Sequence, residues 1–241
     1  MISNRELIEK FNFNPKVICY IGANEGQEIS DILSFFPNSL IYCFEPQKIP
    51  FDLLKKRYGN EQNIYLYNFA LGSENKIVNI NTNNNNNSMS SSILEPHEHL
   101  NYHKNVTFEG TEEVVMKKFC DLNIKNIDYL NIDVQGYEIE VLKGFENLEK
   151  VRYIKSEVNR KEMYKNCALV KDLDVYLKQF NFLRVKTIWW KKIIPWGDAF
   201  YLQQDQLSQF QIFYVKLRNK VQGIKGYFWL LSLLIRLGIV K

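Results

Sequence analysis

Two neighbouring segments, residues 17–26 (VICYIGANEG) and residues 40–46 (LIYCFEP), constrain the fold of this chain more than any other part of its sequence. The first is a nearly continuous apolar run followed by a turn that carries Gly22 and Gly26. The second is another apolar run, and it ends in Glu45. A buried strand, a glycine turn and a second strand ending in an acid are typical of the nucleoside-binding crevice of an open α/β sheet.

Each part of this pattern has a physical role. Gly22 and Gly26 allow a tight turn and a close approach of backbone to ligand. A helix beginning after Gly26 would offer free N–H groups to a carboxylate. At the carboxyl end of its strand, Glu45 can accept hydrogen bonds from both hydroxyls of a ribose.

The glycine spacing bears on which nucleoside is bound. The turn reads G-x-x-x-G, whereas dinucleotide-binding turns favour G-x-G-x-x-G, in which the second glycine admits a pyrophosphate. S-adenosylmethionine has no phosphate, so this spacing favours it. NAD or FAD, and a purely structural glycine turn, remain as alternatives.

Four further segments accompany this pattern: NFALG (68–72), SSSI (90–93), IDVQGYEIEVLKG (132–144) and GDAFYL (197–202). Together with YIGANEG and FEP they resemble the FkbM-type family of S-adenosylmethionine-dependent O-methyltransferases over residues 17–202. The resemblance implies a Rossmann-like class I methyltransferase fold, α/β, with a seven-stranded mainly parallel sheet, helices on both faces and an antiparallel edge strand. It also implies a hydroxyl acceptor on a sugar, glycan or other secondary metabolite. The family usually carries an acidic residue where Tyr20 stands.

The expected site divides into a cofactor side and an acceptor side. For the methionine part of the cofactor we expect Gly22, Ala23, Asn24 and Gly26, for its ribose Glu45, and for its adenine Ala70 and Leu71. The acceptor side is expected to hold three carboxylates, Asp133, Glu157 and Asp198, of which Asp133 can also contact the cofactor. A hydroxyl acceptor needs a base or a metal, and no metal ligands are assigned.

Each of these three carboxylates, and the nearby Glu138, could have a structural role instead of a role in the site. Asp133 can cap the helix that follows it, and Glu138 can simply complement that helix's dipole. Glu157 at a strand end can be solvated, and Asp198 can fix the turn at residues 196–197.

Apolar patterning predicts alternating strands and helices after a short first helix with a capping box of Ser3 and Glu6. Strands are expected at 17–21, 40–44, 63–69, 128–132, 151–157, 181–188 and 198–203. Helices are expected at 26–36, 48–59, 137–148 and 168–180. This alternation requires a mainly parallel sheet, which we assign to one catalytic domain at residues 1–205.

Two polar segments have weaker readings. Seven of the nine residues 79–87 are asparagine, which favours a loop, either plain low-complexity sequence or part of a lid over the site. The segment HEHLNYH holds the three histidines, His97, His99 and His103. It lacks the further ligands of a metal site, so we expect a solvated or acceptor-facing loop, from which one histidine could serve as a base.

Composition places the chain among soluble enzymes of the cytoplasm. With 46% hydrophobic residues it can build a large core. The four cysteines are scattered without a CxxC pair, and the first residues, ISNRELIEKF, do not form a signal peptide, so we expect reduced thiols and a cytoplasmic location.

Residues 206–241 form a separate basic, amphipathic helical tail. They carry a charge of +6 without a single acid, leaving −2 on the remainder. Residues 227–235 (YFWLLSLLI) are strongly apolar but too short to span a bilayer. The segment 223–241 therefore suits either contact with the inner face of a membrane or packing within the chain or in a homo-oligomer. No nucleic-acid-binding motif accompanies the basic charge.

The sequence thus predicts an S-adenosylmethionine-dependent O-methyltransferase acting on a sugar, glycan or secondary metabolite. Two alternatives of other classes remain. One is an NAD-dependent Rossmann oxidoreductase, and the other is a catalytically silent, membrane-associated scaffold.

Overall fold

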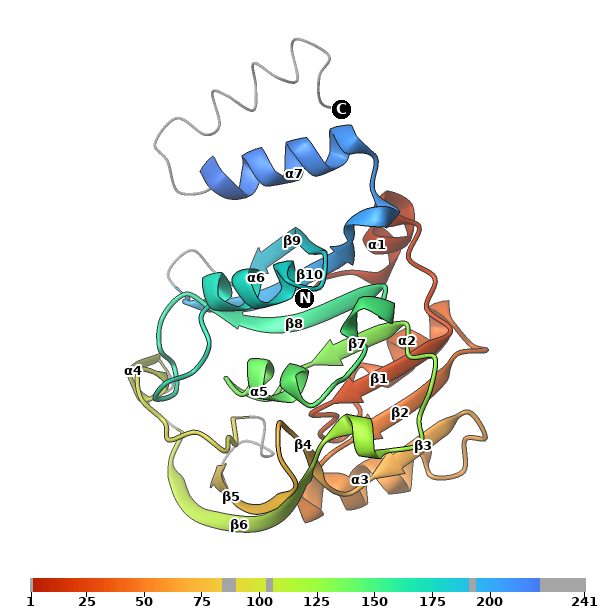
Figure 1. Cartoon of the computed structure of the whole chain (residues 1–241). Helices are drawn as coiled ribbons and strands as arrows, with labels where there is room; N and C mark the ends of the chain where they lie inside the picture. Colours follow the sequence, from red (N-terminus) through yellow and green to blue (C-terminus); the bar gives the residue numbers. More distant parts are fainter. Residues whose placement is uncertain (1, 84–89, 103–105, 191–193, 222–241) are drawn as a thin grey trace. The chain divides into compact units, whose positions relative to one another are not determined.

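The computed structural model describes residues 2–83, 90–102, 106–190 and 194–221 (Figure 1). The chain forms two compact units, Met1–Gln203 and Gln204–Lys241, and each is described by itself. The first unit contains every residue assigned above to the cofactor or the acceptor.

The centre of the first unit is a seven-stranded sheet in the order β3-β2-β1-β7-β8-β10-β9. Its strands are β1 (Val17–Ile21), β2 (Leu40–Phe44), β3 (Ile64–Tyr67), β7 (Tyr129–Ile132), β8 (Tyr153–Asn159), β9 (Phe182–Trp189) and β10 (Trp196–Gln203). All neighbouring pairs are parallel except those of β10, which is antiparallel to both β8 and β9. The predicted seven-stranded, mainly parallel α/β fold is therefore confirmed.

One detail of the sheet differs from the expectation. The antiparallel strand was expected at the edge, but β10 lies one strand inside it and β9 is the edge strand. The crossover from β8 through α6 (Val170–Lys178) places β9 beyond a gap, and the chain then returns to fill that gap with β10.

Helices cover both faces of the sheet. On one side of β1 the chain advances through α2 (Ile29–Phe35) and α3 (Lys48–Tyr58), and on the other through α5 (Glu138–Lys143) and α6. Because parallel crossovers are right-handed, this reversal of direction puts the two pairs on opposite faces. Figure 1 shows α5 and α6 together on one face.

The segment between α1 (Asn4–Phe11) and β1 is anchored by one aromatic side chain. Phe13 is almost fully buried and meets four rings edge-on at centroid distances of 4.9 to 5.4 Å. Those rings belong to Phe36, Tyr129, Tyr153 and Phe200. By contrast, Ser3 makes no side-chain capping bond and Glu6 pairs with Lys10 and Lys186, so the predicted capping box is wrong.

A second, three-stranded sheet was not predicted. It consists of β4 (Ala70–Leu71), β6 (Phe108–Lys117) and β5 (Lys76–Asn83), in that order. Ala70, Ile80, Val114 and Met116 form its small core. The residues between the predicted strands at 63–69 and 128–132 therefore build structure of their own, next to the pocket described below.

This sheet corrects part of the loop predicted at residues 79–87. Residues 79–83 belong to β5, while 84–87 lie outside the described residues. Ile80 points into the small core, and Asn81 exchanges both backbone hydrogen bonds with Ser92. The Asn81 amide also donates to the carbonyl of Leu94 at 3.0 Å. An apolar side chain that faces the small core, flanked by asparagines that form hydrogen bonds with the neighbouring segment, is sufficient to form a strand that is covered on one face.

The described part of the second unit, residues 204–221, contains a short 3₁₀ helix at Gln204–Gln206 and the helix α7 (Gln209–Val221). The predicted apolar segment at 227–235 lies outside the described residues. Within the residues that can be placed, no helix combines the length and hydropathy that crossing a membrane requires.

Candidate active site

A pocket opens where β1, β2, β7 and β8 end, at the point where the direction of strand addition reverses. Open α/β sheets bind their ligands at this position. Eight of the ten residues assigned to the cofactor or acceptor line it, namely Gly22, Asn24, Glu45, Ala70, Leu71, Asp133, Glu157 and Asp198. The remaining two, Ala23 and Gly26, are not among the described lining residues.

The turn after β1 forms one wall of the pocket. The N–H groups of Gly22 and Ala23 both donate to the carbonyl of Phe44, at 2.9 and 3.0 Å, so the turn is fastened to the end of β2. Ala23 is fully buried, and Gly26 lies against Leu54 and Tyr58 of α3. These two residues shape the turn from behind, and their assignment to the cofactor stays a prediction.

The helix expected from residue 26 begins only at Ile29. The N–H of Gly26 donates to the carbonyl of Ala23, and that of Ile29 donates to Gly26, so the intervening residues form turns. Gln27 and Glu28 of these turns line the pocket with their side chains. The part of the pocket expected to hold the methionine end is therefore bordered by a loop and not by a helix N-terminus.

Glu45 is held in place by the backbone on both sides of it. Its side chain is 4% exposed, and its two oxygens accept N–H bonds from Asn24 at 2.8 Å and from Gln47 at 2.9 Å. Burial raises the pKa of Glu45 to about 7, with Glu112 and Asp133 contributing repulsion. Because each carboxylate oxygen has two lone-pair directions, each can accept a further hydrogen bond from the pocket.

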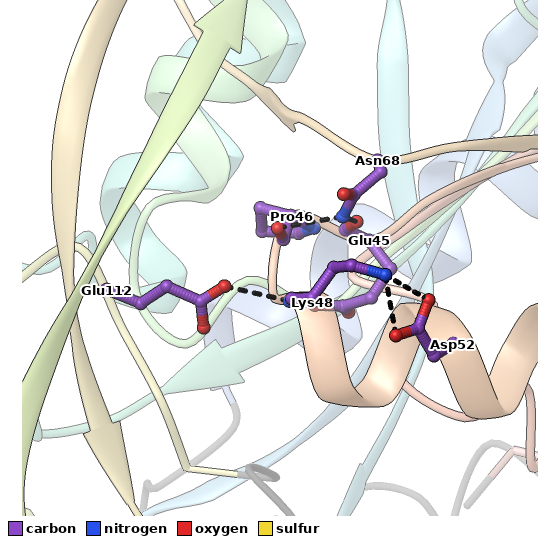
Figure 2. Close-up of polar contacts among 6 residues, drawn as sticks. All are labelled: Glu45, Pro46, Lys48, Asp52, Asn68 and Glu112. Atoms are coloured by element: carbon purple, nitrogen blue, oxygen red, sulfur yellow. Dashed lines mark hydrogen bonds and ion pairs between the residues drawn. The ribbon is translucent and has the colours of Figure 1, made fainter.

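The loop that carries Glu45 is fixed by two more side chains (Figure 2). The Asn68 amide donates to the carbonyls of Glu45 and Pro46 at 3.0 and 2.9 Å. Glu112, from β6 of the small sheet, accepts the N–H of Lys48 at 2.8 Å at the start of α3. Figure 2 shows both contacts converging on this loop, which Asn68 and Glu112 therefore hold between them.

Apolar side chains form another part of the pocket wall. Phe44, Phe69, Ala70 and Leu71 line it, and the rings of Phe44 and Phe69 lie 5.5 Å apart. Flat apolar side chains of this kind suit a purine ring.

Three carboxylates, Asp133, Glu157 and Asp198, also line the pocket. Asp133 follows β7, Glu157 lies in β8, and Asp198 in β10 stands directly opposite Glu157 in the antiparallel register. The pKa of Asp133 is raised to about 6, first by its enclosure in protein and then by neighbouring charges that include Asp198. Glu157 has its pKa raised well above the usual range by burial and by the charge of Asp133. Asp133 keeps an accessible surface toward the pocket.

Gln135 joins two of these carboxylates and was missed in the sequence. Its Nε2 donates to Asp133 Oδ1 at 2.8 Å and to Glu157 Oε2 at 3.0 Å. The residue itself has a φ of +53°, and its Oε1 accepts the hydroxyl hydrogen of Tyr164 at 2.8 Å. Ser92 donates to the Gln135 backbone carbonyl at 2.8 Å. The SSSI and IDVQG segments therefore act together to orient the carboxylates.

Glu138 has the structural role that was left open for it. It is buried in the first turn of α5, and its Oε1 accepts the N–H of Gly136 at 3.0 Å. Burial raises its pKa to about 7. Asp133, in contrast, faces the pocket and binds Gln135, and no side-chain cap is formed at the start of α5.

A further carboxylate, Glu28, approaches the position where the family usually has an acid. Tyr20 lines the pocket, and the charge of Glu28, together with burial, raises the pKa of Tyr20 well above its usual value. Glu28 Oε2 accepts hydrogen bonds from Lys155 at 2.8 Å and from Asn131 at 3.2 Å. No sequence signal distinguished Glu28 from the other acids of the turn.

The histidines separate from one another. His99 is buried and lines a second cavity beside Asp133 and Glu157, whereas His97 is exposed and bonds to the carbonyl of Glu162. His103 lies outside the described residues. Among the residues described, no group of three His, Cys, Asp or Glu side chains is arranged to hold a metal ion.

Comparison with known proteins identifies the domain. The model of the Methyltransferase FkbM domain matches residues 21–184. The chain is similar to 2-O-methyltransferase NoeI of Sinorhizobium fredii (strain NBRC 101917 / NGR234), with 27% identity over 171 residues, which cover 67% of this chain and 70% of that protein.

Solved structures are similar in fold. Methyltransferase FkbM from Methylobacillus flagellatus KT matches with a TM-score of 0.53 and 14% identity, covering 78% of this chain but only 43% of that longer chain. Magnesium protoporphyrin IX methyltransferase from Synechocystis PCC 6803, solved with bound S-adenosylmethionine, matches with a TM-score of 0.48 and 10% identity over 83% of this chain and 75% of that one.

Proposed function

Because the chain belongs to the methyltransferase FkbM family, we propose that it transfers a methyl group from S-adenosylmethionine to a hydroxyl of a sugar or glycan. Membership in this methyltransferase family argues against the alternative of an NAD-dependent oxidoreductase. The main structural support for S-adenosylmethionine as the cofactor is the position of Glu45. This buried acid at the end of β2 lines the pocket and is held there by two backbone N–H groups.

The described pocket fits the parts of this cofactor. Glu45 has one lone-pair direction left on each oxygen for the two ribose hydroxyls, and Phe44, Phe69 and Leu71 provide an apolar surface for adenine. Glu28 takes the place of the usual acid at position 20 as the carboxylate nearest the methionine end. The absence of the middle glycine is no obstacle, because no pyrophosphate has to approach the turn.

When bound, the cofactor supplies an electrophilic methyl group on a sulfonium. The chain's own residues then have to hold the acceptor in line and take its proton as the carbon–oxygen bond forms and the carbon–sulfur bond breaks. Glu157 is the proposed base, because it lines the pocket beside Asp133 and because burial and the charge of Asp133 raise its pKa well above the usual range, which makes it a stronger base than an ordinary glutamate. Gln135 keeps Glu157 and Asp133 in fixed orientation, and Asp198 adds the charge that helps raise both pKa values.

The acceptor class rests on two observations of different kinds. The curated relative is named a 2-O-methyltransferase, which points to oxygen as the methylated atom. The acceptor side of the pocket displays carboxylates and an amide beside an exposed indole, Trp190, and this mixture suits a hydroxylated ring with an apolar face.

We also propose a cytoplasmic location. Cys19, Cys43 and Cys167 are buried free thiols, and Cys120 is free as well, which suits a reducing compartment. For residues 223–241 we propose either contact with a membrane surface or packing within the chain or in a homo-oligomer.

Calorimetric titration with S-adenosylhomocysteine tests the cofactor. Glu45→Gln should weaken binding at least tenfold, because it replaces charge-assisted hydrogen bonds of about 1.5–3 kcal/mol each by neutral ones. Asp52→Asn is the matched control, since Asp52 bonds Lys48 on the surface of α3, away from the residues that line the pocket, and should leave the affinity unchanged. Native affinity in a folded Glu45→Gln variant would remove Glu45 from the ribose site.

A transfer assay tests the reaction itself. Labelled methyl groups should move from S-adenosylmethionine to cell-surface glycans or their lipid-linked precursors. A protein that binds the cofactor but labels no glycan or other hydroxyl compound would support the catalytically silent scaffold.

A further inference from the structure

A second cavity adjoins the cofactor pocket and shares four of its residues. Asp133, Gln135, Glu157 and Trp190 line both, so a molecule in either cavity can reach the same two carboxylates. The second cavity extends from these residues to Asn159 at the end of β8.

Asn159 is the unusual residue of this second cavity. It is 2% exposed, and its Nδ2 is buried without a hydrogen-bond partner in the part of the chain that the structure describes. A buried amide N–H that forms no hydrogen bond destabilises the fold, so such a group calls for a partner that the chain itself does not supply. Because Asn159 lies two residues after Glu157 in the same strand, both side chains project from the same face of β8.

Aromatic side chains form the apolar part of the second cavity. Trp190 is 54% exposed, and Trp196 is held edge-on by Tyr102 at a centroid distance of 5.9 Å. A pyranose ring presents C–H groups on its faces and hydroxyls around its rim. Indole faces match the former, and an amide donor and carboxylate acceptors match the latter.

We propose that the second cavity binds a pyranose ring of the acceptor, and that the Asn159 amide donates a hydrogen bond to an oxygen adjacent to the hydroxyl that Glu157 deprotonates. This rests on the proposed methyltransferase function and adds the group that positions the acceptor. Asn159 is thereby a specificity residue. A sugar that lacks the neighbouring oxygen leaves the buried amide unpaired and is rejected.

The experiment uses the full chain saturated with S-adenosylhomocysteine. Methyl glycosides of glucose, galactose, mannose and fucose are the probes, and saturation-transfer NMR with titration measures their binding. Asn159→Leu removes the donor at nearly constant volume, and Asn159→Ala is a second, smaller replacement. Asn60→Leu, at an exposed position, is the matched control.

We expect at least one glycoside to bind the wild type and the Asn60→Leu variant. Both Asn159 variants should bind it at least tenfold more weakly, while S-adenosylhomocysteine affinity stays unchanged. The Tm of Asn159→Leu should stay the same or rise, because an unpaired buried amide is lost. Trp190→Ala should also weaken binding of the glycoside. Because the Trp190 side chain is exposed, this variant should fold normally.

Two results would overturn the proposal while leaving the proposed function intact. The first is glycoside binding by a folded Asn159→Leu variant with wild-type affinity. The second is a wild-type protein that binds S-adenosylhomocysteine but shows no saturation transfer to any of the four glycosides. Failure of the wild type to bind S-adenosylhomocysteine would instead contradict the proposed function.

Discussion

Gly22 faces the backbone carbonyl of Asp133 so closely that a Cβ on Gly22 would lie 1.8 Å from that oxygen. Gly22 also has a φ of +78°, a backbone conformation that residues other than glycine rarely adopt. Gly22→Ala should therefore separate the ends of β1 and β7 and lower the Tm, in addition to abolishing cofactor binding. Thermal unfolding followed by circular dichroism measures this.

Gly110 in β6 is the control for that substitution. A Cβ there would approach only the Thr82 hydroxyl, at 3.0 Å, so Gly110→Ala should keep cofactor binding and nearly all stability. A Gly22→Ala protein as stable as Gly110→Ala would contradict the contact between Gly22 and Asp133.

The paired carboxylates predict the pH dependence of turnover. The base must be deprotonated, and the pKa of Asp133 is raised to about 6 while that of Glu157 is raised well above its usual range. The value of kcat/KM should thus fall as the pH drops through this raised region, well above the pH at which an ordinary glutamate is protonated, about 4.3. A pH–rate profile that is flat down to pH 5 would exclude both carboxylates as the base.

Removing one charge should shift the profile in a defined direction. The charge of Asp133 raises the pKa of Glu157, so Asp133→Asn should move the acidic limb to lower pH, even though kcat also falls. Glu157→Gln should instead reduce turnover by about 10²–10⁴-fold at pH 8 and remove the acidic limb of the profile, without weakening the binding of S-adenosylhomocysteine. If the acidic limb of the pH–rate profile does not shift in a folded, active Asp133→Asn variant, the limb reports the titration of a group other than Glu157.

The ionised side chain of Glu157 should lower the stability of the folded protein at neutral pH. Because the folded pKa of Glu157 lies above its unfolded value, the folded state binds more protons, and its stability falls as the pH rises through the raised pKa. Glu157→Gln should thus raise the Tm at pH 8, and the gain should shrink toward pH 4. The exposed Glu61→Gln control should show neither effect, and an equal gain at both pH values would contradict the ionisation argument.

Deletion of residues 223–241 distinguishes the two roles open for the tail. We expect the full chain to sediment with anionic phospholipid vesicles, because each basic residue near such a surface contributes about 1 kcal/mol, and the effect should weaken with salt. A chain that ends at residue 222 should remain in the supernatant and still bind S-adenosylhomocysteine. No sedimentation of the full chain, with a changed oligomeric state after deletion, would favour packing.

The elements around Glu45 could be predicted because their signals are local. The observed bounds of β1 and β2 agree with the apolar runs at 17–21 and 40–44, and Glu45 follows directly from the end of the second run. Strand order and the meeting of Asp133 with Glu157 then follow from parallel topology, which brings strand ends to one edge of the sheet.

Other parts depend on contacts between distant segments and left no local pattern. The asparagines of β5 form a strand only because β6 pairs with them about thirty residues later in the chain. The role of Gln135 depends on Tyr164, and that of Glu28 on Lys155, so neither residue is distinguishable from an ordinary surface residue by its neighbours in sequence.

The hydrogen bond from Lys48 to Glu112 connects the small sheet to the loop that carries Glu45. Local opening of β6 would remove the acceptor for the first N–H of α3, and the loop that carries Glu45 would lose part of its support. We therefore expect ligand binding to stabilise the pairing of β6 in the small sheet. The backbone amides of β6, which belong to a different sheet from β2, should exchange with deuterium more slowly once S-adenosylhomocysteine is bound.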